Sequence, residues 1–178
     1  MTRHRVQFPV SESEHLDQDQ TYFYLTENGD PAKFRFHDYD EIYRRPGLYE
    51  QIFYDRLQCA SPRKVATILR SAVEQAGGFV STLRVLDLGA GNGIMGEELR
   101  SIGVARLLGA DIIEEAREAC YRDRPGIYDD YFVVDFTELG PAVRDELRSW
   151  QIDCLTTVAA LGFGDIPPQA FVNAFNLV

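Results

Sequence analysis

The 178 residues are enough for one domain with a sizeable core, and 45% apolar with 12% aromatic residues argues against a disordered chain. Eighteen Lys and Arg against 28 Asp and Glu give a formal charge of -10, which repels phosphate backbones and anionic lipid. We therefore expect neither a nucleic acid nor a membrane as partner. The apolar runs are shorter than the roughly 20 residues that span a bilayer, and the N-terminus lacks a signal peptide, so the sequence predicts a soluble, cytoplasmic protein.

The cysteines give no sign of a disulfide or a metal site. Cys59, Cys120 and Cys154 are widely spaced and form no Cys-x-x-Cys pair, which favours buried, reduced thiols. No group of His, Cys and carboxylate residues has the spacing of metal ligands, so we expect no metal.

The first 60 residues divide into two predicted segments. Residues 1–20 are polar and without periodicity, which predicts a flexible leader. In residues 21–60, aromatic runs at 21–25 and 33–37 flank an Asn28-Gly29 turn signal, which predicts a β-hairpin. Apolar residues then recur at helical spacing over 38–57, and Pro46-Gly47 interrupts them, so we expect two short helices.

Residues 61–178 alternate between helix and strand signals. Ser61-Pro62 begins a helix that ends at Gly77-Gly78, and its predicted buried face includes Ile68 and Leu69. The predicted strands are 84–88, 106–110, 131–134 and 152–158, and helices are expected at 94–102, 114–121, 141–150 and 169–176. This order is typical of the α/β class with a parallel sheet and helices on both faces.

A glycine-rich turn follows the first of these strands. The run Asp87-Leu88-Gly89-Ala90-Gly91-Asn92-Gly93 has three glycines that allow left-handed torsions and close approach of a ligand. Gly91 to Gly96 also satisfies the dinucleotide pattern G-x-G-x-x-G. Asp87 would repel a pyrophosphate at this turn, whereas S-adenosylmethionine has no phosphate and carries a sulfonium and an ammonium. We therefore favour S-adenosylmethionine as the cofactor.

The pattern Asp87-x-Gly89-x-Gly91-x-Gly93 resembles motif I of class I S-adenosylmethionine-dependent methyltransferases. The resemblance implies a Rossmann-like domain over 61–178 and methyl transfer. It also implies a set of cofactor-binding residues: Asp87, Gly89, Ala90, Gly91 and Gly93 at the turn, Asp111 at the ribose hydroxyls, Asp135 at the adenine amine, Ile112 or Phe136 against the ring, and Val158 beside the methyl donor. The alternative for each acid is a helix N-cap or a solvated residue at a strand end.

The segment from Phe36 to Tyr43 resembles the lid that covers the cofactor in such enzymes. The resemblance places Tyr39 and Tyr43 near the methionine end and makes His37 the candidate base, while other catalytic residues are not predicted. Alternatively, the two tyrosines form the buried stripe of a helix and His37 lies on the surface. The acceptor expected is a small molecule. The rival functions are a noncatalytic cofactor-binding module and an NAD-dependent oxidoreductase.

The resemblance also implies an incomplete sheet. A complete class I domain has seven strands, and the sequence reaches the fourth strand and one further helix, so we expect a chain cut before the fifth strand. A sheet that ends there would expose an apolar edge, through which two copies could associate.

Overall fold

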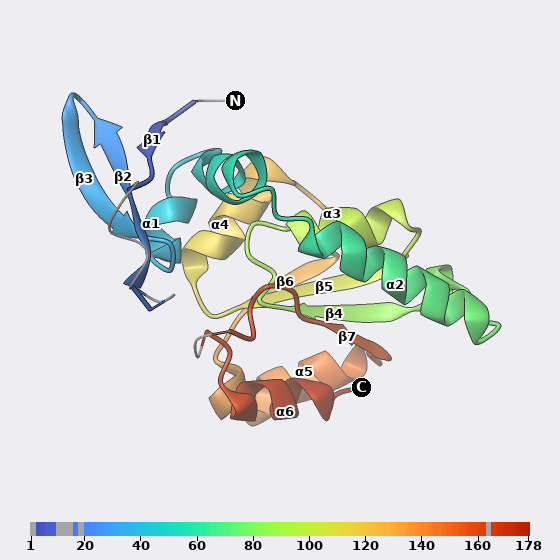
Figure 1. The fold of residues 1–178 in the computed structure, drawn as a ribbon. Helices are drawn as coiled ribbons and strands as arrows, with labels where there is room; N and C mark the ends of the chain where they lie inside the picture. Colours follow the sequence, from blue (N-terminus) through green and yellow to red (C-terminus); the bar gives the residue numbers. More distant parts are fainter. Residues whose placement is uncertain (1–2, 10–15, 18–19, 163–164) are drawn as a thin grey trace. The chain divides into compact units, whose positions relative to one another are not determined.

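A computed structural model describes residues 3–9, 16–17, 20–162 and 165–178. The chain divides into two compact units, Met1–Cys59 and Ala60–Val178 (Figure 1). Each unit has its own hydrophobic core.

The first unit is built on an antiparallel sheet in the order β1-β2-β3. Strands β2 (Tyr22–Glu27) and β3 (Asp30–Arg35) form the predicted hairpin. Asn28 and Gly29 have φ of 55° and 97°, as the two central residues of a type I′ turn require. The hairpin is therefore confirmed, with strands that meet at the two-residue turn.

Strand β1 (Arg5–Gln7) pairs with β2 and corrects the prediction of a flexible leader. A strand of three residues is too short to show alternation, and the backbone hydrogen bonds that add it to the edge of β2 leave no pattern in the sequence. Val6 also packs against the core of this unit. The rest of the predicted leader includes residues 10–15 and 18–19, which lie outside the described residues.

Two short helices follow, as the interruption at Pro46-Gly47 predicts. They are α1 (Tyr39–Tyr43) and the π-helix η3 (Glu50–Arg56), and Gly47 between them has φ of 80°. The sheet and these helices enclose one cluster of fully buried side chains: Phe23, Leu25, Ile42, Leu48 and Ile52.

The second unit has a four-stranded parallel sheet in the order β6-β5-β4-β7. Its strands are β4 (Arg84–Leu88), β5 (Arg106–Asp111), β6 (Asp130–Val133) and β7 (Cys154–Thr156). All four predicted strands are present. The order places the first strand in the middle, with the second and third on one side and the fourth on the other.

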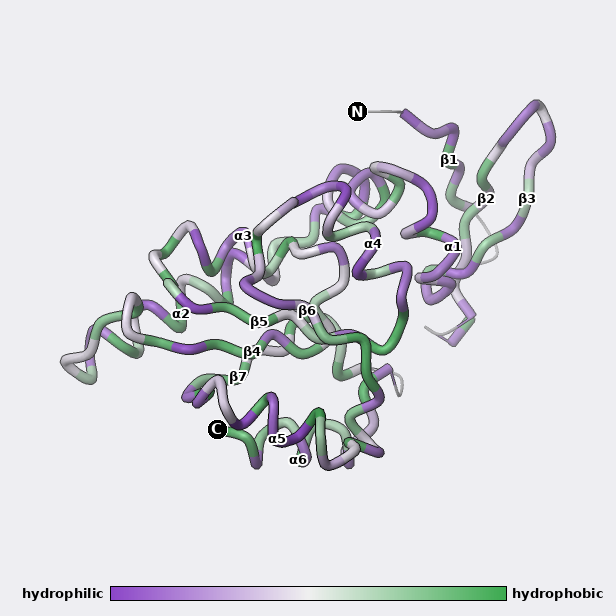
Figure 2. The backbone as a smooth tube through the Cα atoms, turned by 180° about the vertical axis from the view of Figure 1, so that it is seen from behind, coloured by the Kyte–Doolittle hydropathy of each residue, from purple (hydrophilic) through white to green (hydrophobic). Residues whose placement is uncertain are grey.

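Helices cover both faces of this sheet, which confirms the α/β class (Figures 1 and 2). One layer holds α2 (Ser61–Gln75), α3 (Ile94–Ser101) and α4 (Glu114–Asp123), and the other holds α5 (Pro141–Ser149) and α6 (Pro168–Phe175). Two short 3-10 helices, η4 (Val80–Thr82) and η5 (Phe136–Glu138), lie in the connections. The side chains of β4 point to both faces of the sheet. Val85 packs in the core under α2, α3 and α4, and Leu86 and Leu88 pack in the core under α5 and α6.

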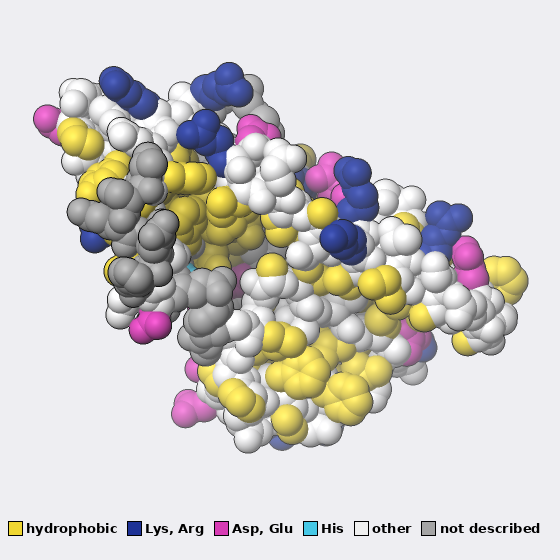
Figure 3. Space-filling view, viewed as in Figure 1, with side chains coloured by type: hydrophobic (Ala, Val, Ile, Leu, Met, Phe, Trp, Pro, Cys, Tyr) yellow, Lys and Arg dark blue, Asp and Glu magenta, His cyan; other side chains and the backbone are white. Residues whose placement is uncertain are grey.

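Two surface features of this unit bear on the predictions. Ile68 of α2 is 67% exposed, so its predicted place on the buried face is wrong, because α2 packs through Pro62, Val65, Ala66 and Leu69 instead. In α6, which follows the edge strand β7, apolar side chains gather on the surface (Figure 3). Phe175 is 60% exposed and Val172 is 47% exposed.

Candidate cofactor site

The glycine turn joins the carboxyl end of β4 to the first residue of α3. Gly89, Gly91 and Gly93 have φ of 75°, 53° and 88°, so each adopts the left-handed conformation that the sequence predicts for it. The N–H groups of Gly89 and Ala90 both donate to the Ala110 carbonyl at 2.9 Å. The turn is thereby tied to the end of the neighbouring strand β5.

The space beside two of these glycines is filled by the chain itself. A Cβ on Gly89 would lie 2.9 Å from the Ala160 Cβ, and a Cβ on Gly93 would lie 2.9 Å from the Cys120 Sγ. The expectation that a missing Cβ makes room for a ligand is therefore wrong at Gly89 and Gly93. At these two positions glycine permits the left-handed backbone torsion and lets the turn pack closely against other residues of the same unit.

Asp111, the last residue of β5, holds the turn from the other side. Its Oδ2 accepts the Gly91 N–H at 2.9 Å, and its Oδ1 accepts the N–H groups of Ile112 at 2.8 Å and Ile113 at 3.3 Å. Burial raises the pKa of Asp111, and the three N–H donors lower it in part. A carboxylate has about four lone-pair sites, so the backbone leaves one of them, on Oδ2, for a ligand. Two bonds to a ribose diol would require one of the present bonds to open.

Asp87 is a buried carboxyl beneath the turn. It is 1% exposed, and its two oxygens accept from the Tyr128 hydroxyl at 2.7 Å and from the Thr156 hydroxyl at 2.8 Å. Burial raises its pKa to about 6, the two hydroxyl donors lower it in part, and the charge of Asp111 raises it further. Both oxygens of Asp87 thus accept hydrogen bonds from protein hydroxyls.

Two tyrosines that the sequence analysis missed support the turn from below. Tyr128 binds Asp87, and the Tyr131 hydroxyl donates to the Gly91 carbonyl at 2.7 Å. A Cβ on Gly109 would lie 2.8 Å from the Tyr131 ring, and one on Gly96 would lie 2.7 Å from the Tyr128 ring. The signal in the sequence was a glycine inside a strand and another inside a helix, where each marks a close approach.

The residues expected around the adenine separate into exposed and buried ones. Ile112 is 60% exposed at the end of β5. Asp135 is exposed and caps η5, because its Oδ1 accepts both the N–H and the hydroxyl of Thr137 at 2.7 Å. Phe136 is 3% exposed within the core between the sheet and α5 and α6. The prediction of Phe136 against the ring is therefore wrong, because its side chain is used for packing.

The connection after β7 lies at the same end of the sheet as the turn. Val158 is partly buried against the core under α2 and α3, and Ala159 has a left-handed φ of 56°. The buried Thr157 hydroxyl finds no hydrogen-bond partner among the residues that the structure describes. Such an orphaned hydroxyl is costly unless a ligand or water pairs with it.

The three catalytic candidates belong to an aromatic cluster in the first unit. The rings of His37 and Tyr39 lie 5.7 Å apart, and Tyr39 stacks on Tyr43 at 6.2 Å. Tyr43 is 6% exposed and also stacks on Tyr49 at 5.0 Å. Tyr43 is therefore buried, as the alternative of a buried helical stripe expects, whereas Tyr39 is only partly buried.

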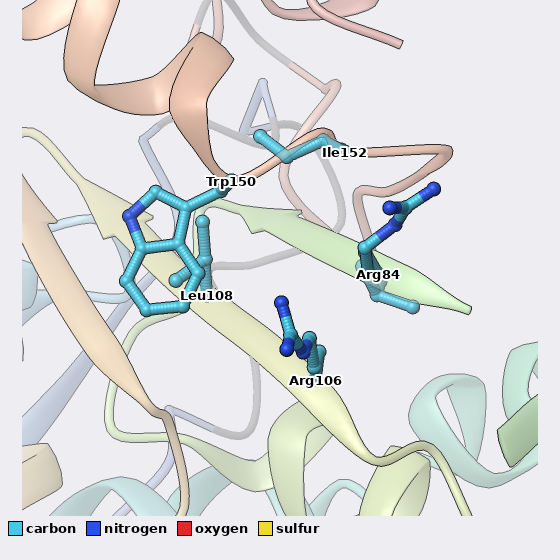
Figure 4. Close-up of a pocket in the computed structure, with 6 residues that line it drawn as sticks. Arg84, Arg106, Leu108, Trp150 and Ile152 are labelled. Carbon is cyan, nitrogen blue, oxygen red and sulfur yellow. The ribbon is translucent and has the colours of Figure 1, made fainter. Parts of the chain in front are cut away.

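A separate cleft lies at the opposite end of the parallel sheet (Figure 4). It is a shallow, open hollow lined by Trp150, Ile152 and the first residues of β4 and β5, Arg84 and Arg106. Arg84 is held there by an ion pair with Asp153 at 2.9 Å. Because the glycine turn follows the carboxyl end of β4, this cleft is not part of the candidate site.

The residues that the structure describes contain no group of three or more His, Cys, Asp or Glu side chains placed to hold a metal ion. In the same residues, no helix is both long and apolar enough to cross a membrane.

Comparison with known proteins finds partial similarity to solved structures. No family model and no curated protein matches the sequence. Among solved structures, magnesium protoporphyrin IX methyltransferase from Synechocystis, solved with bound S-adenosylmethionine, is similar at 16% identity and a TM-score of 0.48, over 78% of this chain and 67% of that one. A proposed RNA methyltransferase from Pyrococcus horikoshii is similar at 17% identity and a TM-score of 0.45, over 64% of this chain. A protein from Thermoplasma acidophilum is similar at 21% identity and a TM-score of 0.42, over 63% of this chain.

The chain spans 55% of the length of both the Pyrococcus and the Thermoplasma protein. These likenesses assign no substrate and no partner to it.

Proposed function

We propose that the second unit binds S-adenosylmethionine at the glycine turn and that the protein transfers its methyl group to a small molecule. The observation that carries the proposal is a pair of neighbouring carboxyls at the turn: Asp87, which is buried, and Asp111, which is partly buried. The charge of Asp111 raises the pKa of Asp87. A cationic ligand relieves this repulsion, whereas a pyrophosphate increases it.

The residues present fit this cofactor. Asp111 has one lone-pair site left for a ribose hydroxyl, and exposed Ile112 beside it offers an apolar surface to the adenine. Asp135, which caps η5 through Oδ1, is assigned to the exocyclic amine through Oδ2. Val158 and the orphaned hydroxyl of Thr157 are assigned to the methionine end.

The cofactor, once bound, supplies a methyl group on a sulfonium, and transfer needs in-line positioning more than covalent help from the protein. The chain contributes a fixed turn, buried negative charge under it and an apolar surface for the base. A small-molecule acceptor is favoured because a net charge of -10 repels nucleic acid. His37, Tyr39 and Tyr43 are the candidates for orienting that acceptor.

Calorimetric titration with S-adenosylhomocysteine and with NADH tests the proposal. We expect saturable binding of S-adenosylhomocysteine and none of NADH. An Asp111→Ala variant loses a charged hydrogen-bond partner and should bind roughly ten- to a hundredfold more weakly. Asp153→Ala is the matched control, because Asp153 also accepts a backbone N–H at a strand end, from Arg84 at 2.7 Å, but belongs to the opposite end of the sheet.

Binding of NADH alone would replace the proposal with an oxidoreductase. Binding of S-adenosylhomocysteine without methyl transfer to any acceptor would favour a noncatalytic cofactor-binding module. Failure of a folded chain to bind either ligand would contradict the proposal.

A further inference from the structure

The geometry points to Tyr131 as a positioning residue that fixes the Gly91–Asn92 peptide and thereby prepares the turn for its ligand. The identity of the ligand in this inference rests on the proposed function. The fixing of the turn rests on the contacts of Tyr131 alone.

The two peptide groups of Gly91 are held by different side chains. Asp111 accepts the Gly91 N–H at 2.9 Å, which fixes the peptide that precedes Gly91. Tyr131 donates to the Gly91 carbonyl at 2.7 Å, which fixes the peptide that follows it. Gly91 has φ of 53°, and glycine crosses between positive and negative φ at little steric cost. Without a partner on each side, nothing in the residue itself would keep this conformation.

The bond also sets the direction of a donor. The described chain has no cis peptide bond, and in a trans peptide the carbonyl and the next N–H point in opposite directions. With its carbonyl directed at the Tyr131 hydroxyl, Gly91 turns the Asn92 N–H away from that ring. The bond from Tyr131 thus fixes the orientation of the Gly91–Asn92 peptide within the turn.

The position of Tyr131 is itself closely fitted. Its ring lies over Gly109 of β5, where a Cβ would come within 2.8 Å of it, and it meets the Tyr128 ring edge to face at 5.6 Å. Tyr131 is 4% exposed. These packing contacts are made by the ring, so a phenylalanine would keep them. The hydroxyl makes the hydrogen bond to the turn, so removing this one oxygen separates the positioning role from the structural role.

The test compares Tyr131→Phe with Tyr121→Phe. The two rings lie 6.3 Å apart, and Tyr121 is 52% exposed, so its hydroxyl is a neighbouring one outside the turn. For each variant we would measure the dissociation constant of S-adenosylhomocysteine, amide hydrogen exchange by NMR over residues 89–93, and the free energy of unfolding in urea. Binding is measured only under conditions in which urea unfolding shows that each variant is folded.

We expect Tyr131→Phe to raise the dissociation constant about tenfold, as the loss of one buried hydrogen bond predicts. Amide exchange at Gly91, Asn92 and Gly93 should become about tenfold faster, after the change at the slowest core amides is subtracted. Tyr121→Phe should change neither. A merely structural role would lower the unfolding free energy but leave the affinity of the folded chain unchanged, and that result would overturn the inference.

The two proposals fail separately. If the wild-type chain does not bind S-adenosylhomocysteine, the proposed function fails, while faster local exchange in Tyr131→Phe still supports the fixing of the turn. If exchange over residues 89–93 is the same in Tyr131→Phe and Tyr121→Phe, the inference fails whether or not the ligand binds.

Discussion

Asp87 and Tyr128 form a buried hydrogen bond of 2.7 Å between residues that are 41 positions apart in the chain. The bond joins the end of β4 to the segment that leads into β6. Asp87 bonds Thr156 on the other side, so one carboxyl connects three parts of the domain. Burial nevertheless dominates its titration and raises its pKa from 3.8 to about 6.

This pKa predicts how stability depends on pH. The folded state holds the Asp87 proton more tightly than the unfolded state, so its contribution is fully present below about pH 4 and is lost as pH rises through 6. A shift of about two units corresponds to about 3 kcal/mol. Asp87→Asn keeps the site neutral, and the Tyr128 and Thr156 hydroxyls can turn to match its amide.

We therefore expect the free energy of unfolding of Asp87→Asn, relative to wild type, to increase by about 2.5 kcal/mol between pH 4 and pH 7.5. Urea unfolding at several pH values measures it. A difference between the two proteins that stays constant over this range would contradict a buried carboxyl with a raised pKa.

The close packing at Gly89 gives a second prediction. Gly89 and Gly126 have nearly equal φ, 75° and 73°, but a Cβ meets Ala160 at 2.9 Å at the first position and nothing within 4 Å at the second. Gly126→Ala should cost about 1 to 2 kcal/mol for the left-handed torsion alone. Gly89→Ala should cost about 1 to 3 kcal/mol more, because it adds overpacking. Equal losses in thermal or urea unfolding would show that the segment around Ala160 does not press on the turn.

Phe136 and Ile112, the two alternatives for the contact with the adenine ring, differ in burial: 3% and 60% of their surfaces are exposed. Phe136→Ala removes a buried ring from the core beneath α5 and α6 and should destabilise the protein by about 3 to 5 kcal/mol. Ile112→Ala changes a side chain that is 60% exposed and should alter stability by less than about 0.5 kcal/mol while it weakens S-adenosylhomocysteine binding. Chemical denaturation with a parallel titration decides between them, and the reverse pattern would restore Phe136 to the site.

Much of the second unit could be predicted because its signals are local. The strand Arg84–Leu88 is an apolar run that ends at a glycine turn, and the turn torsions follow from the glycines themselves. Asp111 could be singled out because it ends the next strand, where the resemblance places an acid, and its bond to the Gly91 N–H shows that it lies beside the turn.

The remainder depends on contacts between distant residues. That Phe136 enters the core while Ile112 stays exposed depends on which face of the sheet α5 and α6 cover. The bonds from Tyr128 to Asp87 and from Tyr131 to Gly91 join residues 41 and 40 positions apart, and no periodicity carries such information. Strand β1 was missed for the same reason, because only pairing with β2 makes it a strand.

The most direct measurement of the central claim is an NMR titration of the labelled chain with S-adenosylhomocysteine, followed at the backbone amides. The account predicts saturable shifts at Gly89, Gly91, Gly93, Asp111 and Ile112, with little change at Arg84 and Arg106 at the other end of the sheet. Saturable shifts that gather around Trp150 and Arg106, or no shifts in a folded chain, would contradict a cofactor site at the glycine turn.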